Sequence, residues 1–155
     1  VGAMAIPVAR LLLQESGSLG KLQFRDFAQE FNVAGDPEAF AGPVVILVDE
    51  GTASTSEIFA AGLRDLGRVR VAGARASAGA ALPSLLERLD SGGLLQYVVG
   101  DYHSAKGTVA EGDGVSPDIT AVETRADFVA GRDPVLAAAV AALAAGGPGQ
   151  KTTGH

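Results

Sequence analysis

A serine at the junction of a strand and a helix is the residue of this chain best placed to do chemistry. Residues 44–48 form a continuous apolar run, residues 49–51 (Asp-Glu-Gly) end it, and Ser54 precedes a helical pattern of apolar residues. Ser54 would lie beside the positive end of the helix dipole, as a nucleophile on a strand-to-helix turn does. If Ser54 attacked a carbonyl carbon, the Thr55 backbone N–H could donate to the resulting oxyanion, which is worth about 3–4 kcal/mol.

The same residues also have a purely structural interpretation. Ser54 stands three residues before Glu57, and Ser-x-x-Glu ahead of an apolar helix is the signature of a capping box. On this tetrapeptide alone capping is favoured, because helix ends routinely need such partners. A catalytic role requires a general base, an oxyanion site and a cleft as well.

Few residues could act as the general base. His103 follows a predicted strand, Lys106 lies in a Lys-Gly turn, and His155 lies in the final residues. Glu111 stands among glycines in a long loop, where it is either a solvated charge or a group that orients a base. Asp118, after a proline, is predicted to be a turn residue.

Composition excludes several other classes of site. The chain has 155 residues, no cysteine and a formal net charge of −6, with no basic cluster, so neither thiolate chemistry nor nucleic-acid binding is expected. No His/Asp/Glu group has metal-ligand spacing and no phosphate-binding glycine loop is present, so we expect no metal and no cofactor. No apolar run approaches the roughly 20 residues that span a membrane. The abundant alanine and the 21 glycines suggest close packing of helices on sheet.

The segments around Ser54 predict an α/β fold. A strand at 44–48, a helix at 55–66 and a strand at 69–72 would form a strand–helix–strand unit with a parallel, buried strand pair. Residues 22–33 are predicted to form two short strands, residues 73–84 a loop of small residues, and residues 94–102 and 118–122 further strands. The helix at 55–66 would bury one apolar face, which comprises Ile58, Phe59, Gly62, Leu63 and Leu66.

Two further helices complete the predicted elements. Residues 5–14 have helical spacing with a proline near the start, and we expect the face of Val8, Leu11 and Leu12 to be buried. The last helix opens at Asp133-Pro134 and is expected to bury Leu136, Val140 and Leu143. Residues 1–147 would form one folded unit, and residues 148–155 a flexible tail.

Three blocks of the chain resemble the catalytic domain of the C-terminal processing (tail-specific) serine peptidases. They are GPVVILVDEGTASTSEIFAAGLRDLGR, VAGARASAGAALPS and AEGDGVSPDI, in the family's order and spacing. The resemblance implies stacked βα units like those of the Clp protease and crotonase cores. It also implies Ser54 as nucleophile and the Thr55 N–H as an oxyanion donor, with a glycine amide from an upstream turn whose end we place at Val1-Gly2.

The family has two catalytic branches, and this sequence departs from one of them. In the Ser-Lys branch the loop after the second strand reads Thr-Phe-Gly-Lys-Gly, whereas here Gly79 occupies the lysine position. The other branch, with the tricorn-type proteases and the interphotoreceptor retinoid-binding proteins, uses a Ser-His pair with an auxiliary serine and glutamate. Its loop resembles residues 77–79, and its glutamate corresponds to Glu111.

The leading hypothesis is therefore a serine peptidase that acts on peptides or proteins through an acyl-enzyme on Ser54. The family's histidine and auxiliary serine lie upstream of the nucleophile strand, so we expect this chain to be the C-terminal part of a catalytic domain, inactive alone. One alternative is a non-catalytic module that binds an apolar ligand, and another is a crotonase-like acyl-CoA enzyme. The resemblance implies an extracytoplasmic protein, while homo-oligomerisation and substrate sequence stay open.

Overall fold

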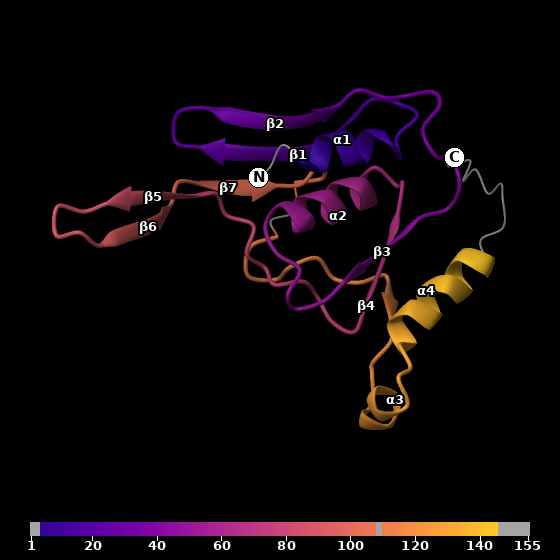
Figure 1. The fold of residues 1–155 in the computed structure, drawn as a ribbon. Helices are drawn as coiled ribbons and strands as arrows, with labels where there is room; N and C mark the ends of the chain where they lie inside the picture. The colour runs from indigo at the N-terminus through magenta and orange to yellow at the C-terminus, as the bar shows by residue number, and fades with distance from the viewer. Residues whose placement is uncertain (1–3, 108–109, 146–155) are drawn as a thin grey trace.

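The computed structural model describes residues 4–107 and 110–145, which form a mixed α/β fold with two small sheets and a projecting hairpin (Figure 1). One sheet has the strand order β2-β1-β7, the second β3-β4-β8, and the hairpin pairs β5 with β6. The strands are β1 (Gly17–Phe24), β2 (Ala28–Val33), β3 (Val45–Val48), β4 (Arg70–Gly73), β5 (Ser84–Arg88), β6 (Leu94–Val98), β7 (Gly100–His103) and β8 (Ile119–Thr120). The helices are α1 (Ala5–Arg10), α2 (Thr55–Asp65), α3 (Arg125–Val129) and α4 (Pro134–Ala145).

The predicted strand–helix–strand unit is present as β3, α2 and β4. β3 and β4 are parallel, with Val45 opposite Arg70 and Val48 opposite Gly73. β8 continues the sheet in parallel on the other side of β4, which confirms a short strand within 118–122. Asp118 fixes that register, because its carboxylate accepts from the Val71 N–H at 2.8 Å and its own N–H donates to the Val71 carbonyl.

The β2-β1-β7 sheet is antiparallel and lies against α2. The two strands predicted within 22–33 are β1 and β2, although β1 begins earlier, at Gly17. β7 adds to the other edge of β1, so segments far apart in the sequence meet here. α2 approaches β1 so closely that a Cβ on Gly62 would lie 2.6 Å from the Leu19 Cα. The small residues expected to allow close helix-on-sheet packing do so at this point.

The expected buried faces of the first and last helices are wrong. α1 is shorter than predicted and buries Ala5 and Ala9, while Val8 and Leu11 are exposed. α4 likewise buries Ala139, whereas Leu136 and Val140 are exposed and Leu143 is half-buried. In both helices the small alanine side chains face the neighbouring elements, where they allow close packing, and the larger side chains face outward.

The central elements differ less from expectation. α2 buries Ile58, Gly62 and Leu63 as predicted, but Phe59 is half-buried and Leu66 is exposed. β3 is an edge strand in this sheet. Leu47 is exposed, so the strand is not covered on both faces as predicted.

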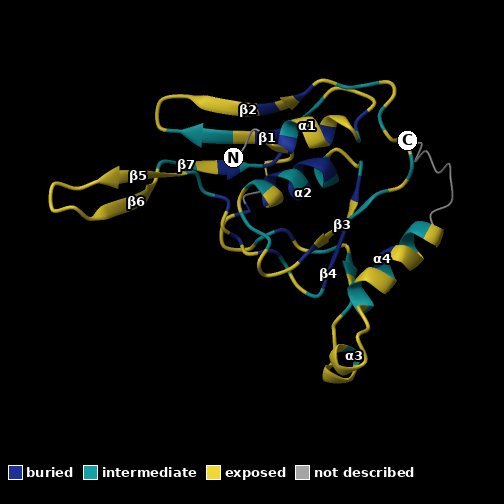
Figure 2. Ribbon diagram, viewed as in Figure 1, coloured by how far each residue is buried: buried dark blue, intermediate teal, exposed yellow. Residues whose placement is uncertain are grey.

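Residues 94–102 do not form one strand. β6 ends at Val98 and β7 begins at Gly100, and the two strands belong to different sheets. β6 instead pairs with β5, which the sequence pattern did not predict, and both strands are exposed throughout (Figure 2). An apolar run predicts a strand without indicating whether anything covers it.

None of the helices in the part of the chain that the structure describes is long and apolar enough to cross a membrane.

The core residue Tyr102 predicts a pH dependence of stability. Its hydroxyl is buried and donates to the Leu19 carbonyl at 2.7 Å. Burial, with a smaller effect of Asp65, raises the pKa of Tyr102 above its ordinary value. The unfolded chain therefore loses this proton at lower pH than the folded chain does. The stabilisation is complete below about pH 10 and is lost as the pH rises above it.

We expect Tyr102→Phe to lower the free energy of unfolding by about 1 kcal/mol at neutral pH, because the Leu19 carbonyl loses its partner. The free energy of unfolding of the variant should also fall less steeply than that of the wild type above about pH 10. Tyr97→Phe, which alters an exposed tyrosine, is the matched control and should change neither quantity. Urea unfolding between pH 7 and 11 measures both. An alkaline decline of equal steepness in all three proteins would contradict the assignment to Tyr102.

Candidate active site

Ser54 sits on a strained turn between β3 and α2. Its backbone has φ 59° and ψ −125°, and it is the one non-glycine residue with positive φ among residues 4–107 and 110–145. Such a conformation costs on the order of 1–3 kcal/mol and persists only where surrounding contacts hold it. The side chain is exposed. Ser54 therefore lies exposed at the N-terminus of α2, where the sequence predicts it.

The capping-box arrangement that the sequence predicts is present. Glu57 accepts the Ser54 N–H at 3.0 Å, which is one of the two hydrogen bonds of a capping box. Ser54 and Glu57 have the capping-box arrangement, but the Ser54 hydroxyl makes no side-chain capping hydrogen bond. The hydroxyl thus faces the first turn of α2 without forming a capping hydrogen bond to it.

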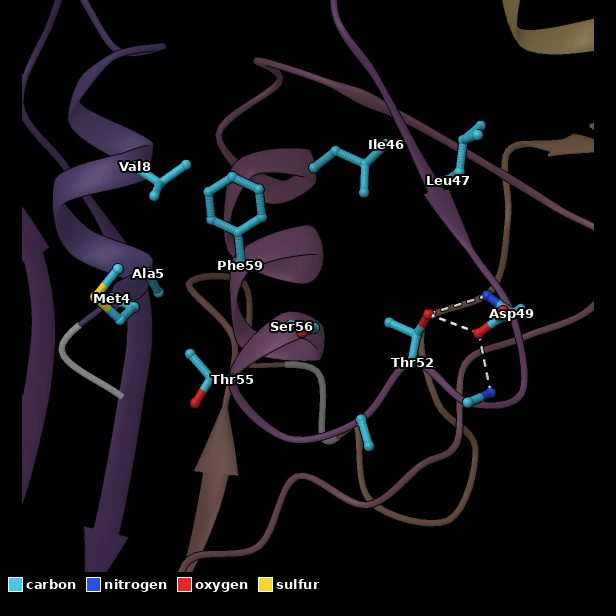
Figure 3. Close-up of a pocket in the computed structure, with 12 residues that line it drawn as sticks. Met4, Ala5, Val8, Ile46, Leu47, Asp49, Thr52, Thr55, Ser56 and Phe59 are labelled. Atoms are coloured by element: carbon cyan, nitrogen blue, oxygen red, sulfur yellow. Dashed lines mark hydrogen bonds between the residues drawn. The ribbon is translucent and has the colours of Figure 1, made fainter. Parts of the chain in front are cut away.

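The turn before Ser54 is stiffened by its own side chains. The Asp49 carboxylate accepts from the Gly51 N–H and from the Thr52 hydroxyl, both at 3.0 Å, and Thr52 Oγ1 accepts from the Asp49 N–H at 3.1 Å (Figure 3). These local hydrogen bonds take the place of the hydrogen bonds between strands where β3 ends. They fix the path by which the chain leaves β3 and enters α2.

The buried Glu57 carboxylate joins this turn to the loop after β4. One oxygen accepts from the Ser77 hydroxyl at 2.5 Å and the Gly79 N–H at 2.8 Å. The other accepts from the Ala80 and Ser54 N–H groups, both at 3.0 Å. Four donors around two oxygens suit an ionised carboxylate, which is an acceptor only. In addition, the Ser54 N–H is shared with the Ala80 carbonyl at 3.0 Å.

The small residues of the 77–80 loop are explained by close backbone packing. Gly79 has φ +68°, and a Cβ there would lie 2.7 Å from the Gly112 carbonyl oxygen. The Ser77 hydroxyl accepts from the Val115 N–H at 2.7 Å, and a Cβ on Gly114 would lie 2.3 Å from the Ser77 carbonyl oxygen. A lysine at position 79 is incompatible with this packing, in line with the departure from the Ser-Lys pattern.

Glu111 and Ser54 line one cavity. Its volume is about 400 Å³. Its other walls come from Ala80, Leu82 and the base of the β5–β6 hairpin, which contributes Ser84 and residues 96–98. Glu111 is held there because one carboxylate oxygen accepts from the Ala81 N–H at 2.9 Å. The structure thus brings together two residues that the sequence separates by a whole strand pair.

Thr55 begins α2 and lines a different, larger cavity of about 690 Å³ (Figure 3). Apolar side chains from α1, β3 and α2 dominate this cavity, among them Met4, Val8, Ile46 and Phe59. As a first-turn group of α2, the Thr55 N–H lacks an intrahelical acceptor. Its role as an oxyanion donor stays a prediction, and Val1-Gly2, the predicted second donor, lies outside the described residues.

The structure does not place the two described base candidates beside Ser54. The Lys106 N–H donates to the Asp65 carboxylate at 3.0 Å, at the C-terminal end of α2. His103 ends β7 only three residues earlier. Since a helix rises about 1.5 Å per residue, Asp65 lies roughly 15 Å along α2 from Ser54. His155 lies outside the described residues.

Metal-binding groups were not predicted from the sequence. Within residues 4–107 and 110–145, no three His, Asp or Glu side chains are grouped so as to hold a metal ion.

Sequence reasoning missed the part played by Glu57 and Ser77. Both are buried polar residues, and together they connect α2 to the 77–80 and 110–115 loops. The sequence pattern predicts for Glu57 only one half of a capping box. The available signal was its place beside Ile58, four residues before Ala61, on the apolar side of the helix, where an unpartnered carboxylate would be costly.

Comparison with known proteins gives concordant results. Residues 4–121 match the family model of peptidase family S41. The chain is 28% identical over 118 residues to a probable CtpA-like serine protease of Staphylococcus aureus, covering 75% of this chain and 24% of that protein. It thus spans about a quarter of the length of such relatives.

Solved structures are similar as well. The photosystem II D1 C-terminal processing protease superposes with a TM-score of 0.67 at 30% identity, covering 78% of this chain and 31% of that one. A candidate peptidase from Parabacteroides merdae superposes with a TM-score of 0.79 at 20% identity, covering 92% of this chain and 48% of that one.

The family match covers the strained serine turn, the 77–80 loop and Glu111 together, and with the strand–helix–strand core it leads to one conclusion: this chain belongs to peptidase family S41, the C-terminal processing serine peptidases.

Proposed function

We propose that this chain carries the nucleophile of a serine peptidase, with Ser54 as the attacking residue. The observation that supports this most directly is the state of Ser54. It is held at positive φ at the start of α2, and its hydroxyl makes no capping bond. Strain of this kind that is not needed for capping is typical of functional sites. The apolar-ligand module and the acyl-CoA enzyme are not favoured by the family matches.

The reaction begins with attack on a peptide carbonyl. The Ser54 oxygen bonds to the carbonyl carbon, its proton passes to a general base, and the carbonyl oxygen becomes an oxyanion facing the Thr55 N–H. The C–N bond then breaks as the base returns the proton to the leaving amine. Water, activated by the same base, hydrolyses the acyl-enzyme and restores the Ser54 hydroxyl.

The base in this proposal is a histidine from a part of the protein outside the described residues. Two observations support it: His103 and Lys106 lie toward the far end of α2, and the chain spans about a quarter of its curated relatives. Glu111 would orient that histidine and stabilise its charged form, since it lines the same cavity as Ser54. Alone, the chain would be nearly inactive.

Replacing the nucleophile tests the central claim. In the full protein, Ser54→Ala should lower peptide hydrolysis by about 10³-fold or more, because no acyl-enzyme can form. Ser56→Ala, which removes the next exposed serine of the same helix, is the matched control and should retain activity. Initial rates on a fluorogenic casein substrate measure both. Undiminished hydrolysis by Ser54→Ala would contradict the assignment.

Glu111 is tested separately by removing its charge while keeping its shape. Glu111→Gln can still accept the Ala81 N–H, so the loop should hold its position. We expect kcat to fall by about 10–100-fold with KM nearly unchanged, since the lost interaction is with a base charged only during reaction. Asp113→Asn, on the same exposed loop, should retain wild-type kcat. A change confined to KM would argue for a substrate contact instead.

Glu57 is expected to be essential for stability. In Glu57→Gln, an amide nitrogen would face two N–H donors, or the Ser77 hydroxyl and one N–H. At about 1–3 kcal/mol for each buried group left unpaired, we expect a loss of roughly 2–4 kcal/mol in the free energy of unfolding. The exposed Glu50→Gln should change it by less than about 0.5 kcal/mol. Urea unfolding measures both, and equal stability of the two variants would contradict the prediction.

A further inference from the structure

The β5–β6 hairpin projects from the rest of the fold with nothing packed on it among the described residues (Figures 1 and 2). Every residue of both strands is exposed, although most of them are large and apolar. A two-stranded hairpin is marginal on its own, and contiguous exposed apolar surface usually marks a binding site. The hairpin therefore needs a function that accounts for its composition.

The strand register divides the hairpin into two faces. Residues directly opposite each other share a face, and successive pairs alternate. Ser84 lies opposite Val98, Leu86 opposite Gln96, and Arg88 opposite Leu94, and these three pairs form what we call the inner face. The outer face consists of the two pairs between them, Leu85 with Tyr97 and Glu87 with Leu95.

The inner face is continuous with the nucleophile's cavity. Ser84, Gln96 and Val98 line that cavity together with Ser54 and Glu111, and of the outer face only Tyr97 does so. The remaining inner-face residues lie further along the same two strands, away from the body of the fold. A chain lying with one residue at Ser54 could thus continue along the inner face.

The spacing of the inner face fits an extended peptide. Each of the three inner-face pairs, which we call levels, contains one apolar side chain: Val98, Leu86 and Leu94 in turn. Successive levels are two residues apart along the strand, or roughly 6.6 Å. An extended peptide also directs every second side chain to the same side, at the same repeat. Apolar residues at alternate positions of a bound peptide would therefore each meet one apolar level.

We propose that the inner face of the β5–β6 hairpin is the substrate-binding wall of this peptidase. It takes an extended segment with apolar side chains at alternate positions, adjoining the bond presented to Ser54. The proposal rests on the proposed function for its account of the ligand, but it predicts binding that does not depend on chemistry. Leu86 and Leu94 are the specificity-determining residues of this wall.

The experiment measures binding of a defined peptide to the full protein carrying Ser54→Ala, so that no turnover occurs. The probe is a fluorescein-labelled decapeptide in which leucine and serine alternate. Its control has the same composition with the leucines grouped together. Fluorescence anisotropy should show the alternating peptide binding at least about fivefold more tightly, because only it presents all its leucines to one face.

Variants of the two faces provide the matched comparison. The double variant Leu86→Asn/Leu94→Asn alters inner-face leucines that are 68% and 63% exposed, and Leu85→Asn/Leu95→Asn alters outer-face leucines that are 54% and 45% exposed. The inner-face variant should weaken binding of the alternating peptide about tenfold or more, and the outer-face variant less than twofold. Equal far-UV circular dichroism and equal rates of limited proteolysis at the hairpin turn, residues 89–93, verify that the hairpin persists in both variants.

Three outcomes would overturn the proposal. The two double variants could weaken binding equally, neither could weaken it, or the two peptides could bind equally well. A loss of self-association in the inner-face variant without a loss of peptide binding would also overturn it, because the occupant would then be a second copy of this chain. Sedimentation velocity measures that alternative. Face-specific binding in a protein that shows no Ser54-dependent hydrolysis would refute the proposed function and leave the binding surface intact.

Discussion

The structure around the candidate site depends on a single buried carboxylate. Glu57 accepts hydrogen bonds from the Ser77 hydroxyl and from three backbone N–H groups, those of Ser54, Gly79 and Ala80. These bonds hold the start of α2 and the loop after β4 in a fixed arrangement. These interactions are strong where water is excluded, and leaving any donor unpaired there is costly. The strained backbone of Ser54 can persist because these bonds over-determine it.

The glycines near this carboxylate follow from the same constraint. The 77–80 and 110–115 loops approach each other backbone to backbone, and side chains at Gly79 or Gly114 would overlap the opposite chain. The loops are therefore built from residues that can come close, and they bring Glu111 to the cavity that Ser54 lines. The same close packing of these two loops sets the position of Ser54, excludes a lysine at position 79 and places Glu111.

The site has an open side, and the exposed hairpin borders it. The Ser54 cavity is walled by the base of β5 and β6, whose inner face then extends outward. In the proposed function, the packed core would hold Ser54 and Glu111 in place, while the hairpin, which has few tertiary contacts, would offer its surface to the substrate. Elements that bind ligands are commonly drawn from the less stable parts of a fold.

The sequence by itself determined the strand–helix–strand unit, the parallel pairing of β3 with β4 and the place of Ser54 at the start of α2. These follow from local patterns: a continuous apolar run, a polar break and a helical period. It could not determine which faces of the first and last helices are buried, so Leu136 and Val140 were misplaced. It also missed β5 and took 94–102 as one strand instead of two. Only the tertiary structure brought Glu57 to the 77–80 loop and Glu111 to Ser54, because such contacts depend on which distant backbones can approach each other, and no local pattern encodes that.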